Sequence, residues 1–417
     1  MFDKEVWEGF EEKTNSGRDP FLFESLLPLA TGFATAKTVE SAFYALQDRN
    51  LREALDCRIR VYDGENRRDD LIEGAFSQDT LPDEALMGFM QRLTGKERFS
   101  LVVNNLEQAS PKLAADFGQL IQSFFDYKGF PIGGVEQAAF CGNYSGTAFG
   151  IHEGFEHAFL CHLGPGVKDF YCWSRELYVE MVGHRAPTFA DSEAYERLLE
   201  TATLHVLKPG DVLYLPASVY HIGRQDQYSV SVALPFYTYP LKRFLSGKVI
   251  PALSDLTLPF DEEGMSALVP LKNDNPLLSP VTELLESTVR SWVDNELPHY
   301  LNYYWHRLRS NGGWELPRAI SENLLLDTRL SAPERVQRGS VVSLRQPFLA
   351  SYEAGLDCGR DEFRVFIGAQ SIVLADPHGR LISLLERLNQ RESVNVDADE
   401  LIELLSEMSR TGGLHCH

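Results

Sequence analysis

The sequence predicts an α+β protein built around a double-sheet jelly-roll barrel, followed by a helical region and a small domain of strands and helices. Three patterns lead to this prediction. Short runs of β-forming residues, separated by Gly, Pro, Asn and Asp, fill the part from Val135 to Pro240. Apolar residues at helical spacing dominate from Leu241 to Leu316, and strand-like runs followed by amphipathic helices fill the part after Arg338.

The length and composition of the chain bound its organisation. At 417 residues it exceeds what one hydrophobic core usually supports. We expect three parts: residues 1–240 form the barrel with helical elements at its start, 241–337 form a helical region and 338–417 form the last domain. The apolar fraction of 44% is ample for packed cores, and no apolar run approaches the length of a membrane span.

The charge and the cysteines narrow the function classes. The formal net charge of -21 argues against binding to nucleic acid, whose phosphates would repel the protein, and favours a basic peptide or a small cationic substrate. The six cysteines form no CxxC pair, and the first residues lack the basic and apolar regions of a signal peptide. We therefore expect a cytoplasmic protein with reduced thiols and no membrane partner.

Each element predicted in the first part follows from its local pattern. Before the barrel, Phe99–Val103 predicts a buried strand, and Thr38–Leu46 and Pro111–Phe125 predict helices because apolar residues recur every three or four positions. Two further helices, Glu176–Val182 and Ser192–Thr201, are expected as insertions between barrel strands. The barrel strands themselves are expected at Glu136–Cys141, Ala148–His152, Ala158–Leu163, Asp169–Trp173, Thr203–Leu207, Val212–Leu215 and Tyr228–Leu234.

The helical region is expected to mediate dimerisation. Pro280–Leu297 predicts one long amphipathic helix, and His299–Arg309 continues with an aromatic stripe that is typical of packing. The glycines at 312 and 313 end this helix. A helix pair of this kind is expected to pack against a second copy of the chain, which gives a homodimer.

The last domain has the order of a winged-helix-like unit. Strands are expected at Phe363–Ile367 and Ser371–Leu374, and helices at Gly379–Asn389 and Asp397–Ser409. Its helices are acidic, so we expect a packing or protein-interaction role, because DNA binding needs a basic face. The final residues, 415–417, have the sequence His-Cys-His; a frayed end is expected there, with metal binding as the alternative.

Two histidines in the barrel region form a metal-site pattern. The segment GIHEGFEH, residues 150–157, contains His152 and precedes a strand. The segment KPGDVLYLPASVYH, residues 208–221, is a Pro-Gly-Asp turn that feeds an apolar strand and ends at His221. This pattern places both imidazoles at the mouth of the barrel on partnered strands. Two such imidazoles form two corners of the facial iron site of non-haem oxygenases.

From about Phe99 to Pro240 the chain resembles the JmjC-type, or cupin-like, Fe(II)- and 2-oxoglutarate-dependent oxygenases, which share a double-stranded β-helix barrel. Its three-part layout is most similar to the bacterial ribosomal-protein hydroxylase branch, which has a helical dimerisation region and a winged-helix tail. The resemblance implies that His152 and His221 are the iron ligands. It is supported by the Gly-Asp-x-x-Tyr-x-Pro segment that begins at Gly210 and leads to His221.

The same resemblance implies the residues that hold the co-substrate. Lys168, in the strand after the first metal motif, matches the basic residue that pairs with the distal carboxylate of 2-oxoglutarate. Asn143, Tyr144 and Thr147 lie just before the first motif and are expected to add hydrogen bonds to that carboxylate. The alternative for Lys168 is a surface lysine after a glycine turn, because most lysines are exposed.

The chain departs from the family at one position. The first family motif is His-x-Asp or His-x-Glu, and here the third residue is Gly154. Alternation along a strand puts residues 152 and 154 on one face, so the third metal ligand is missing where the family has it. In the halogenases that use iron and 2-oxoglutarate, Gly or Ala stands at this place and a halide takes the vacated coordination position. Chloride carries the same charge as the lost carboxylate.

A glycine at position 154 is also compatible with a rearranged ligand set or with loss of catalysis. In the first case a neighbouring side chain replaces the carboxylate, and Glu156, His157 and His162 are the candidates, the first two brought back by a bulge at the glycine. For each of them a polar role away from the metal is the alternative. In the second case the chain is a cupin-like module that binds a partner.

The sequence therefore predicts an Fe(II)- and 2-oxoglutarate-dependent oxygenase that hydroxylates a polypeptide or amino-acid side chain. A halogenase that uses chloride at Gly154 and a non-catalytic binding module are the two alternatives. The loops over residues 183–192 and 223–228 are expected to line the substrate site, and they contain no motif that identifies the substrate.

Overall fold

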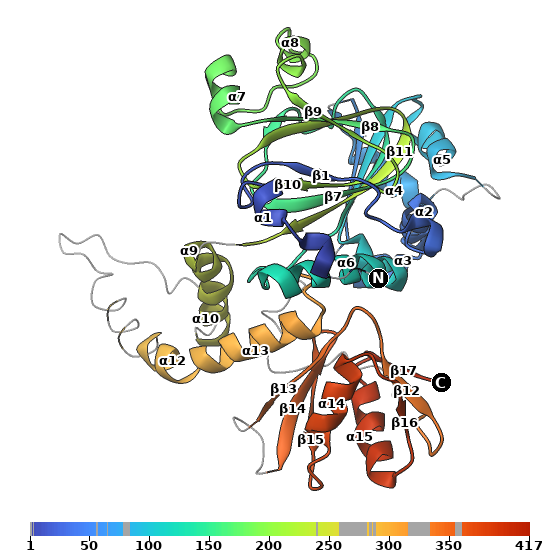
Figure 1. Cartoon of the computed structure of the whole chain (residues 1–417), viewed down its shortest axis with the longest axis vertical. Helices are drawn as coiled ribbons and strands as arrows, with labels where there is room; N and C mark the ends of the chain where they lie inside the picture. The colour runs from blue at the N-terminus through green and yellow to red at the C-terminus, as the bar shows by residue number, and fades with distance from the viewer. Residues whose placement is uncertain are drawn as a thin grey trace, which may run out of the picture. The chain divides into compact units, whose positions relative to one another are not determined.

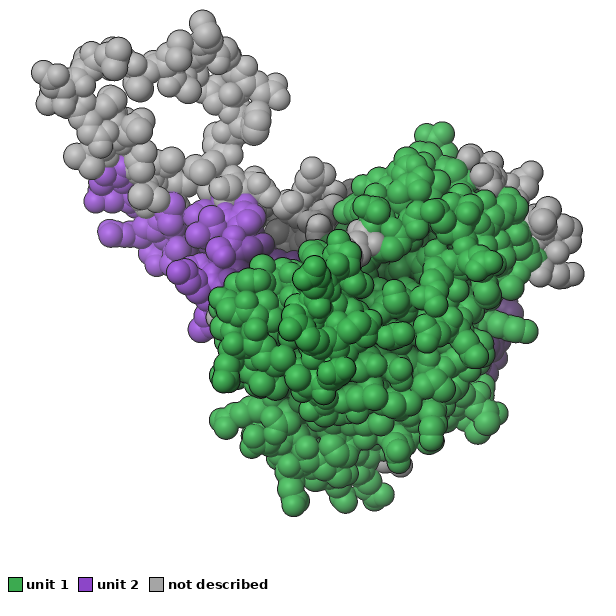
Figure 2. Space-filling view, turned by 90° about the horizontal axis from the view of Figure 1, so that it is seen from above, with its two compact units in different colours: residues 1–238 green, residues 239–417 purple. Residues whose placement is uncertain are grey.

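A computed structural model gives the arrangement of the chain (Figure 1). It describes residues 2, 4–55, 57–64, 66–77, 84–238, 241–257, 282, 286, 289–315, 334–354 and 361–417. The chain divides into two compact units, Met1–Thr238 and Tyr239–His417, which Figure 2 shows in green and purple. The expected helical region and last domain thus fall within one unit, and the barrel forms the other.

The first unit is organised by one large antiparallel sheet. Its strands follow the order β1-β10-β7-β11-β5-β4-β2-β3, and β6, β8 and β9 join through β11 and β8. The strand bounds are β1 Phe21–Phe23, β2 Arg58–Asp63, β3 Asn66–Arg67, β4 Phe99–Asn104, β5 Ala138–Tyr144, β6 His152–Glu153, β7 His157–Pro165, β8 Lys168–Trp173, β9 Thr203–Leu207, β10 Val212–Leu215 and β11 Tyr220–Phe236. The predicted mixed fold with a central antiparallel barrel is confirmed.

Strand β11 joins the two halves of this sheet. Its first part, Tyr220–Arg224, pairs with β6 and β8, and the part from Ser229 to Phe236 pairs with β7 on one side and mostly with β5 on the other. We predicted a loop over residues 223–228, and this prediction is wrong. Gln225 is buried, whereas Asp226 and Gln227 are exposed, so the polar run lies in an extended strand where β11 leaves β8 and its pairing with β5 shifts register.

Helices surround the sheet. Their bounds are η1 Lys4–Trp7, α1 Phe10–Lys13, η2 Leu29–Thr31, α2 Ala36–Ala45, α3 Arg49–Ala54, α4 Asp70–Ser77, α5 Leu86–Thr94, η3 Leu106–Ala109, α6 Pro111–Lys128, α7 Arg175–Val182 and α8 Tyr195–Leu199. The long helix α6 begins where the Ser110 hydroxyl accepts a hydrogen bond from the Leu113 amide, and ends before Gly129, whose φ is positive. Helices α7 and α8 lie together at one end of the barrel (Figure 1).

The second unit contains two three-stranded sheets and several helices. The described helices are α9 Leu241–Phe244, η4 Leu245–Val249, α10 Ile250–Thr257, α12 Arg290–Asn295, α13 Leu297–Ser310, α14 Leu381–Asn389 and α15 Asp399–Ser409. The sheets are β16-β12-β17 and β13-β14-β15, with bounds β12 Val341–Leu344, β13 Ala350–Ala354, β14 Glu362–Ile367, β15 Gln370–Ala375, β16 Val394–Asn395 and β17 Leu414–Cys416. Of the long helix expected at 280–297, residues 280, 281, 283–285, 287 and 288 lie outside the described residues, and its described end forms α12, which stops at Asn295. Dimerisation stays a prediction.

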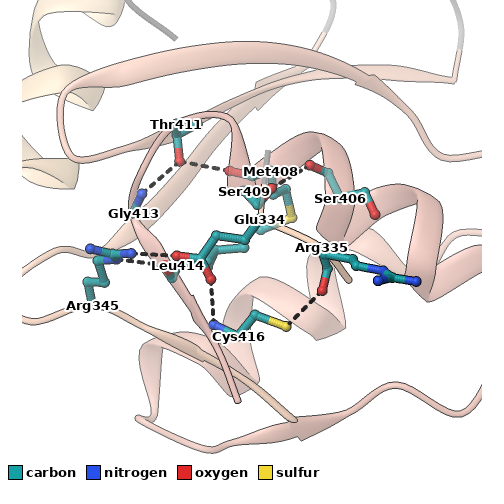
Figure 3. Close-up of polar contacts among 10 residues, drawn as sticks. All are labelled: Glu334, Arg335, Arg345, Ser406, Met408, Ser409, Thr411, Gly413, Leu414 and Cys416. Atoms are coloured by element: carbon teal, nitrogen blue, oxygen red, sulfur yellow. Dashed lines mark hydrogen bonds and ion pairs between the residues drawn. The ribbon is translucent and has the colours of Figure 1, made fainter. Parts of the chain in front are cut away.

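The expectation of a frayed end over residues 415–417 is wrong. Residues Leu414–Cys416 form strand β17, which pairs with β12. Figure 3 shows how Glu334 fixes this strand: its carboxylate accepts from the Cys416 amide at 2.8 Å and from Arg345 Nη2 at 2.5 Å. The Arg345 Nε group in turn donates to the Leu414 carbonyl at 2.7 Å.

Among the described residues no helix combines the length and the apolar character needed to cross a bilayer.

Candidate metal and co-substrate site

The two histidines of the metal motif lie side by side at one end of the barrel. His152 opens strand β6 and is the antiparallel partner of His221 in β11. Their ring centroids lie 4.5 Å apart, with 58° between the ring planes. Side chains at opposite positions of paired strands share one face of the sheet, and both imidazoles line the same cavity.

Each imidazole is held through Nδ1 by the carbonyl two residues before it. His152 Nδ1 lies 2.9 Å from the Gly150 oxygen, and His221 Nδ1 lies 3.1 Å from the Val219 oxygen. Because a carbonyl only accepts, Nδ1 carries the proton and Nε2 keeps its lone pair. Burial lowers the pKa of both imidazoles, that of His221 to about 3, so both are neutral at pH 7. A neutral imidazole with its Nε2 lone pair available is the form that binds a transition metal.

Position 154 faces this histidine pair without a side chain. The Gly154 amide donates to the Val219 oxygen at 3.0 Å, and its carbonyl accepts from the Ser218 amide at 2.7 Å. A Cβ atom at residue 154 would lie 3.2 Å from His221 Cε1. A carboxylate here would therefore reach the same side as His221, as in the family pattern. Among the described residues, no three His, Cys, Asp or Glu side chains come close enough to hold one metal ion.

The structure separates Glu156 from His157. Glu156 lines the cavity of the two histidines, although it forms no three-residue cluster with them. His157 lies in β7 with its Nδ1 atom 2.8 Å from the Tyr214 hydroxyl, and it lines a different cavity. His157 is thus not placed to share a metal ion with His152 and His221.

His162 is also held away from the metal position. Its side chain is fully buried, and both ring nitrogens are occupied: Nδ1 lies 2.9 Å from the Ser231 hydroxyl, and Nε2 lies 2.7 Å from the Gly166 oxygen. A histidine without a nitrogen left for a metal cannot complete the shell. His162 therefore does not complete a three-histidine site.

A buried lysine lies at the other end of the cavity. Lys168 is 1% exposed, and its ammonium group donates to the Tyr144 hydroxyl at 2.7 Å and to Gln225 Oε1 at 3.0 Å. Burial lowers the pKa of Lys168 to about 7, and no carboxylate among the described residues offsets this effect. A buried ammonium without a counter-ion is costly, so this end of the cavity is suited to an anionic ligand. The alternative of a surface lysine at position 168 is wrong.

The cavity that joins the two ends has a volume of about 230 Å³ and is mostly apolar. Thr147 lies in its wall, and the buried Oγ1 atom of this residue has no hydrogen-bond partner among the described residues. Such an atom is costly unless a ligand or water satisfies it. The donors of Thr147 and Lys168 and the two imidazoles therefore fit a metal ion and a bound carboxylate. The apolar lining comes mainly from Ala138, Phe140, Phe149, Ala158, Leu160, Phe170, Leu215 and Ala233.

The other two residues expected at the co-substrate have different positions. Tyr144 contacts the ammonium of Lys168 through its hydroxyl, so it acts on the ligand through that lysine. Asn143 bonds with both atoms of its amide to the chain before β4: Nδ2 donates to the Glu97 oxygen at 3.0 Å, and Oδ1 accepts from the Phe99 amide at 3.3 Å. Asn143 does not line the cavity and is not brought to the site.

Two residues of β11 shape the lysine end. Both fall in the segment 223–228 that was expected to line the substrate site, and Gly223 does line the cavity, but neither was expected to contact Lys168. The Gln225 amide nitrogen donates to the Gly142 and Ser229 oxygens at 2.5 and 3.0 Å, which turns its own oxygen to Lys168. A Cβ atom at Gly223 would lie 2.8 Å from Lys168 Cε, so a side chain at this position would force the lysine to shift. A glycine inside a strand often marks such a close approach, and this signal was available in the sequence.

The fold and the paired histidines resemble those of a JmjC-type, cupin-like barrel. The family model described as the JmjC domain matches residues 179–242, which include the second metal motif. No curated protein matches the chain.

Solved structures of YcfD from Escherichia coli have the same fold over the whole chain. One is described as a ribosomal oxygenase in complex with cobalt and succinic acid; it is 14% identical, with 99% of this chain and 98% of that one covered and a TM-score of 0.51. A second, in complex with cobalt and 2-oxoglutarate, has the same identity, coverage and TM-score. A third structure of YcfD is 15% identical at the same coverage, with a TM-score of 0.52. Similarity at this level of identity establishes the shared fold.

Proposed function

We propose that this protein is an Fe(II)- and 2-oxoglutarate-dependent oxygenase that hydroxylates a polypeptide or amino-acid side chain. One observation carries the proposal: a buried ammonium that no carboxylate in the described part of the chain partners lines the same cavity as two imidazoles with available Nε2 atoms. A co-substrate that chelates a metal at one end and has a second carboxylate at the other fits this arrangement. The acidic chain favours a basic polypeptide as the substrate.

In this proposal the side chains bind and orient, and the metal with its co-substrate supplies the oxidising chemistry. His152 and His221 hold the metal through Nε2, and their carbonyl partners fix the ring orientation. Lys168 and Thr147 bind the far carboxylate. The apolar wall keeps water from competing for these contacts, which strengthens each of them.

The test is anaerobic reconstitution with Fe(II) followed by exposure to oxygen and 2-oxoglutarate. We expect about one iron per chain and release of succinate, first without and then with basic peptides as substrates. Binding of both ligands without succinate release under any condition would instead identify a non-catalytic module.

Halogenation is the second candidate, and the geometry at Gly154 favours it. The missing side chain would have contacted His221, and Gly154 lines the cavity of the two histidines, so a monatomic anion in that cavity could take the place of the carboxylate. Chloride would then balance the charge of the metal as the lost carboxylate does. In a hydroxylase, Glu156, which lines the same cavity, would instead supply the third ligand of the metal.

The Gly154→Asp variant separates these two versions. We expect tighter Co²⁺ binding, by about 10-fold or more, because a third charged ligand joins two neutral ones. If chloride occupies the position in the wild type, chloride should strengthen Co²⁺ binding there and have no effect in the variant. The measurement is a Co²⁺ titration by visible absorption, with and without chloride at constant ionic strength. Indifference of the wild type to chloride, together with products free of halogen, would reject halogenation.

A further inference from the structure

The strand that holds His152 is very short, and this raises the question of what fixes it. Strand β6 contains only His152 and Glu153, and its ladder to β11 has two residue pairs. The residues before it form a turn in which Gly150 has a positive φ. Two ladder positions alone hold an element weakly, because each hydrogen bond contributes about 0.5–1.5 kcal/mol net.

Glu153 anchors this strand through its buried carboxylate, and the residue is itself among those that line the cavity. Its side chain is only 8% exposed and is bound by two arginines. Arg175 Nε donates to Oε1 at 2.7 Å, and the Nη2 group of the same arginine contacts that oxygen too. Arg185 Nη2 donates to Oε2 at 2.6 Å. Both oxygens of one buried carboxylate are thus satisfied by guanidinium groups, an arrangement with strong directional preference.

The two arginines belong to the insertion between β8 and β9, which is itself fixed to the barrel. Arg175 is the first residue of α7, directly after the Ser174 cap. The Arg185 carbonyl accepts from the Tyr220 hydroxyl at 2.9 Å, and Tyr220 is the ladder partner of Glu153. Thr188 exchanges two backbone hydrogen bonds with Ile151, at 2.7 and 3.1 Å. The insertion therefore holds the chain at residue 151, just before β6, and again at residue 153 within it, on either side of His152.

We propose that Glu153, with Arg175 and Arg185, is a positioning residue that fixes His152 and residue 154 at the metal site. This inference rests on the proposed function, because it concerns the metal site of that function. Both carboxylate oxygens of Glu153 are bound by the arginines and are not available to the metal, and alternation along the strand points its side chain away from that of His152. Its effect passes through the backbone of β6 to the imidazole on one side and to Gly154 on the other.

The test compares Glu153→Gln with a matched control in the same unit. Glu136 is also a buried carboxylate, 2% exposed and paired with Arg58, and it does not line the cavity. We expect Glu153→Gln to weaken Co²⁺ binding by about 10-fold. This is the lower end of the loss of metal affinity that follows when a residue supporting a metal ligand is changed. Glu136→Gln should leave Co²⁺ affinity within about 2-fold of the wild type, whatever it does to the melting temperature.

A second measurement does not need the metal. In the metal-free protein, hydrogen exchange of the Gly154 and Ser218 amides, which form the hydrogen bonds after β6, should be about 10-fold faster in Glu153→Gln than in the wild type. The Arg185→Ala variant changes an arginine that is 60% exposed, so it should fold and show the same direction of change. Unchanged exchange and unchanged Co²⁺ affinity in both variants would overturn the positioning role. A wild type that binds no Co²⁺ would overturn the proposed function, and faster exchange in the variants would then still support the anchoring of β6.

Discussion

The His221→Ala variant is expected to lose Co²⁺ binding, with affinity lowered by more than about 100-fold. Removing one imidazole leaves His152 as the single strong ligand. Changing a residue that only supports a ligand already lowers metal affinity by about 10–100-fold, so losing a ligand should cost more. His152→Ala should have the same effect, because the two rings lie 4.5 Å apart and serve one site. The measurement is a Co²⁺ titration followed by visible absorption, which also reports the geometry around the metal.

His205 offers the matched control for this loss. It lies in β9, is partly buried like His221, and does not line the cavity. His205→Ala should therefore bind Co²⁺ as the wild type does. Equal Co²⁺ affinity in His221→Ala and the wild type would show that the metal binds elsewhere, and would remove the basis of the proposed function.

The sequence predicted that His152 and His221 lie on paired strands, because the motifs that contain them are local patterns. The turn and strand that lead to His221 occupy one continuous segment, and β10 and β7 were both expected as strands from their apolar runs. The prediction of a strand over 148–152 was less accurate. Gly150 has a positive φ and its Cβ would lie 2.7 Å from the Thr188 oxygen, so the chain turns there and only His152–Glu153 extends.

The lysine end was predicted only in part, because its contacts join strands that are distant in sequence. Lys168 was expected from the resemblance, whereas Gln225 had been assigned to a loop. A run of polar residues normally indicates a loop, but Gln225 is buried within β11 and satisfies three polar groups. The anchoring role of Glu153 was equally invisible, since Arg175 and Arg185 come from an insertion whose packing does not follow from a local pattern.

The Lys168→Met variant is expected to weaken binding of 2-oxoglutarate by about 10- to 100-fold, the range for loss of a charge-assisted hydrogen bond. Methionine keeps most of the length and the apolar stem of the side chain and removes the charge. Co²⁺ affinity should stay within about 2-fold of the wild type, because an ammonium group has no lone pair to offer a metal. The exposed Lys208, changed to Met, is the control and should bind 2-oxoglutarate normally. Calorimetric titration of the metal-loaded protein measures each affinity.

The affinity for 2-oxoglutarate should also depend on pH, because the charge of Lys168 does. With a pKa of about 7 in the free protein, Lys168 is charged below pH 7 and loses its proton above it. The bound carboxylate needs the charged form, so affinity should be greatest near pH 6 and fall above pH 7 by up to about tenfold per pH unit. Without 2-oxoglutarate, the unfolded chain holds the Lys168 proton more tightly than the folded protein does between pH 7 and the ordinary lysine pKa. The contribution of Lys168 to the free energy of unfolding therefore rises with pH over that window. Lys168→Met should remove both dependences, and a wild-type affinity independent of pH between 6 and 9 would contradict the assignment of Lys168.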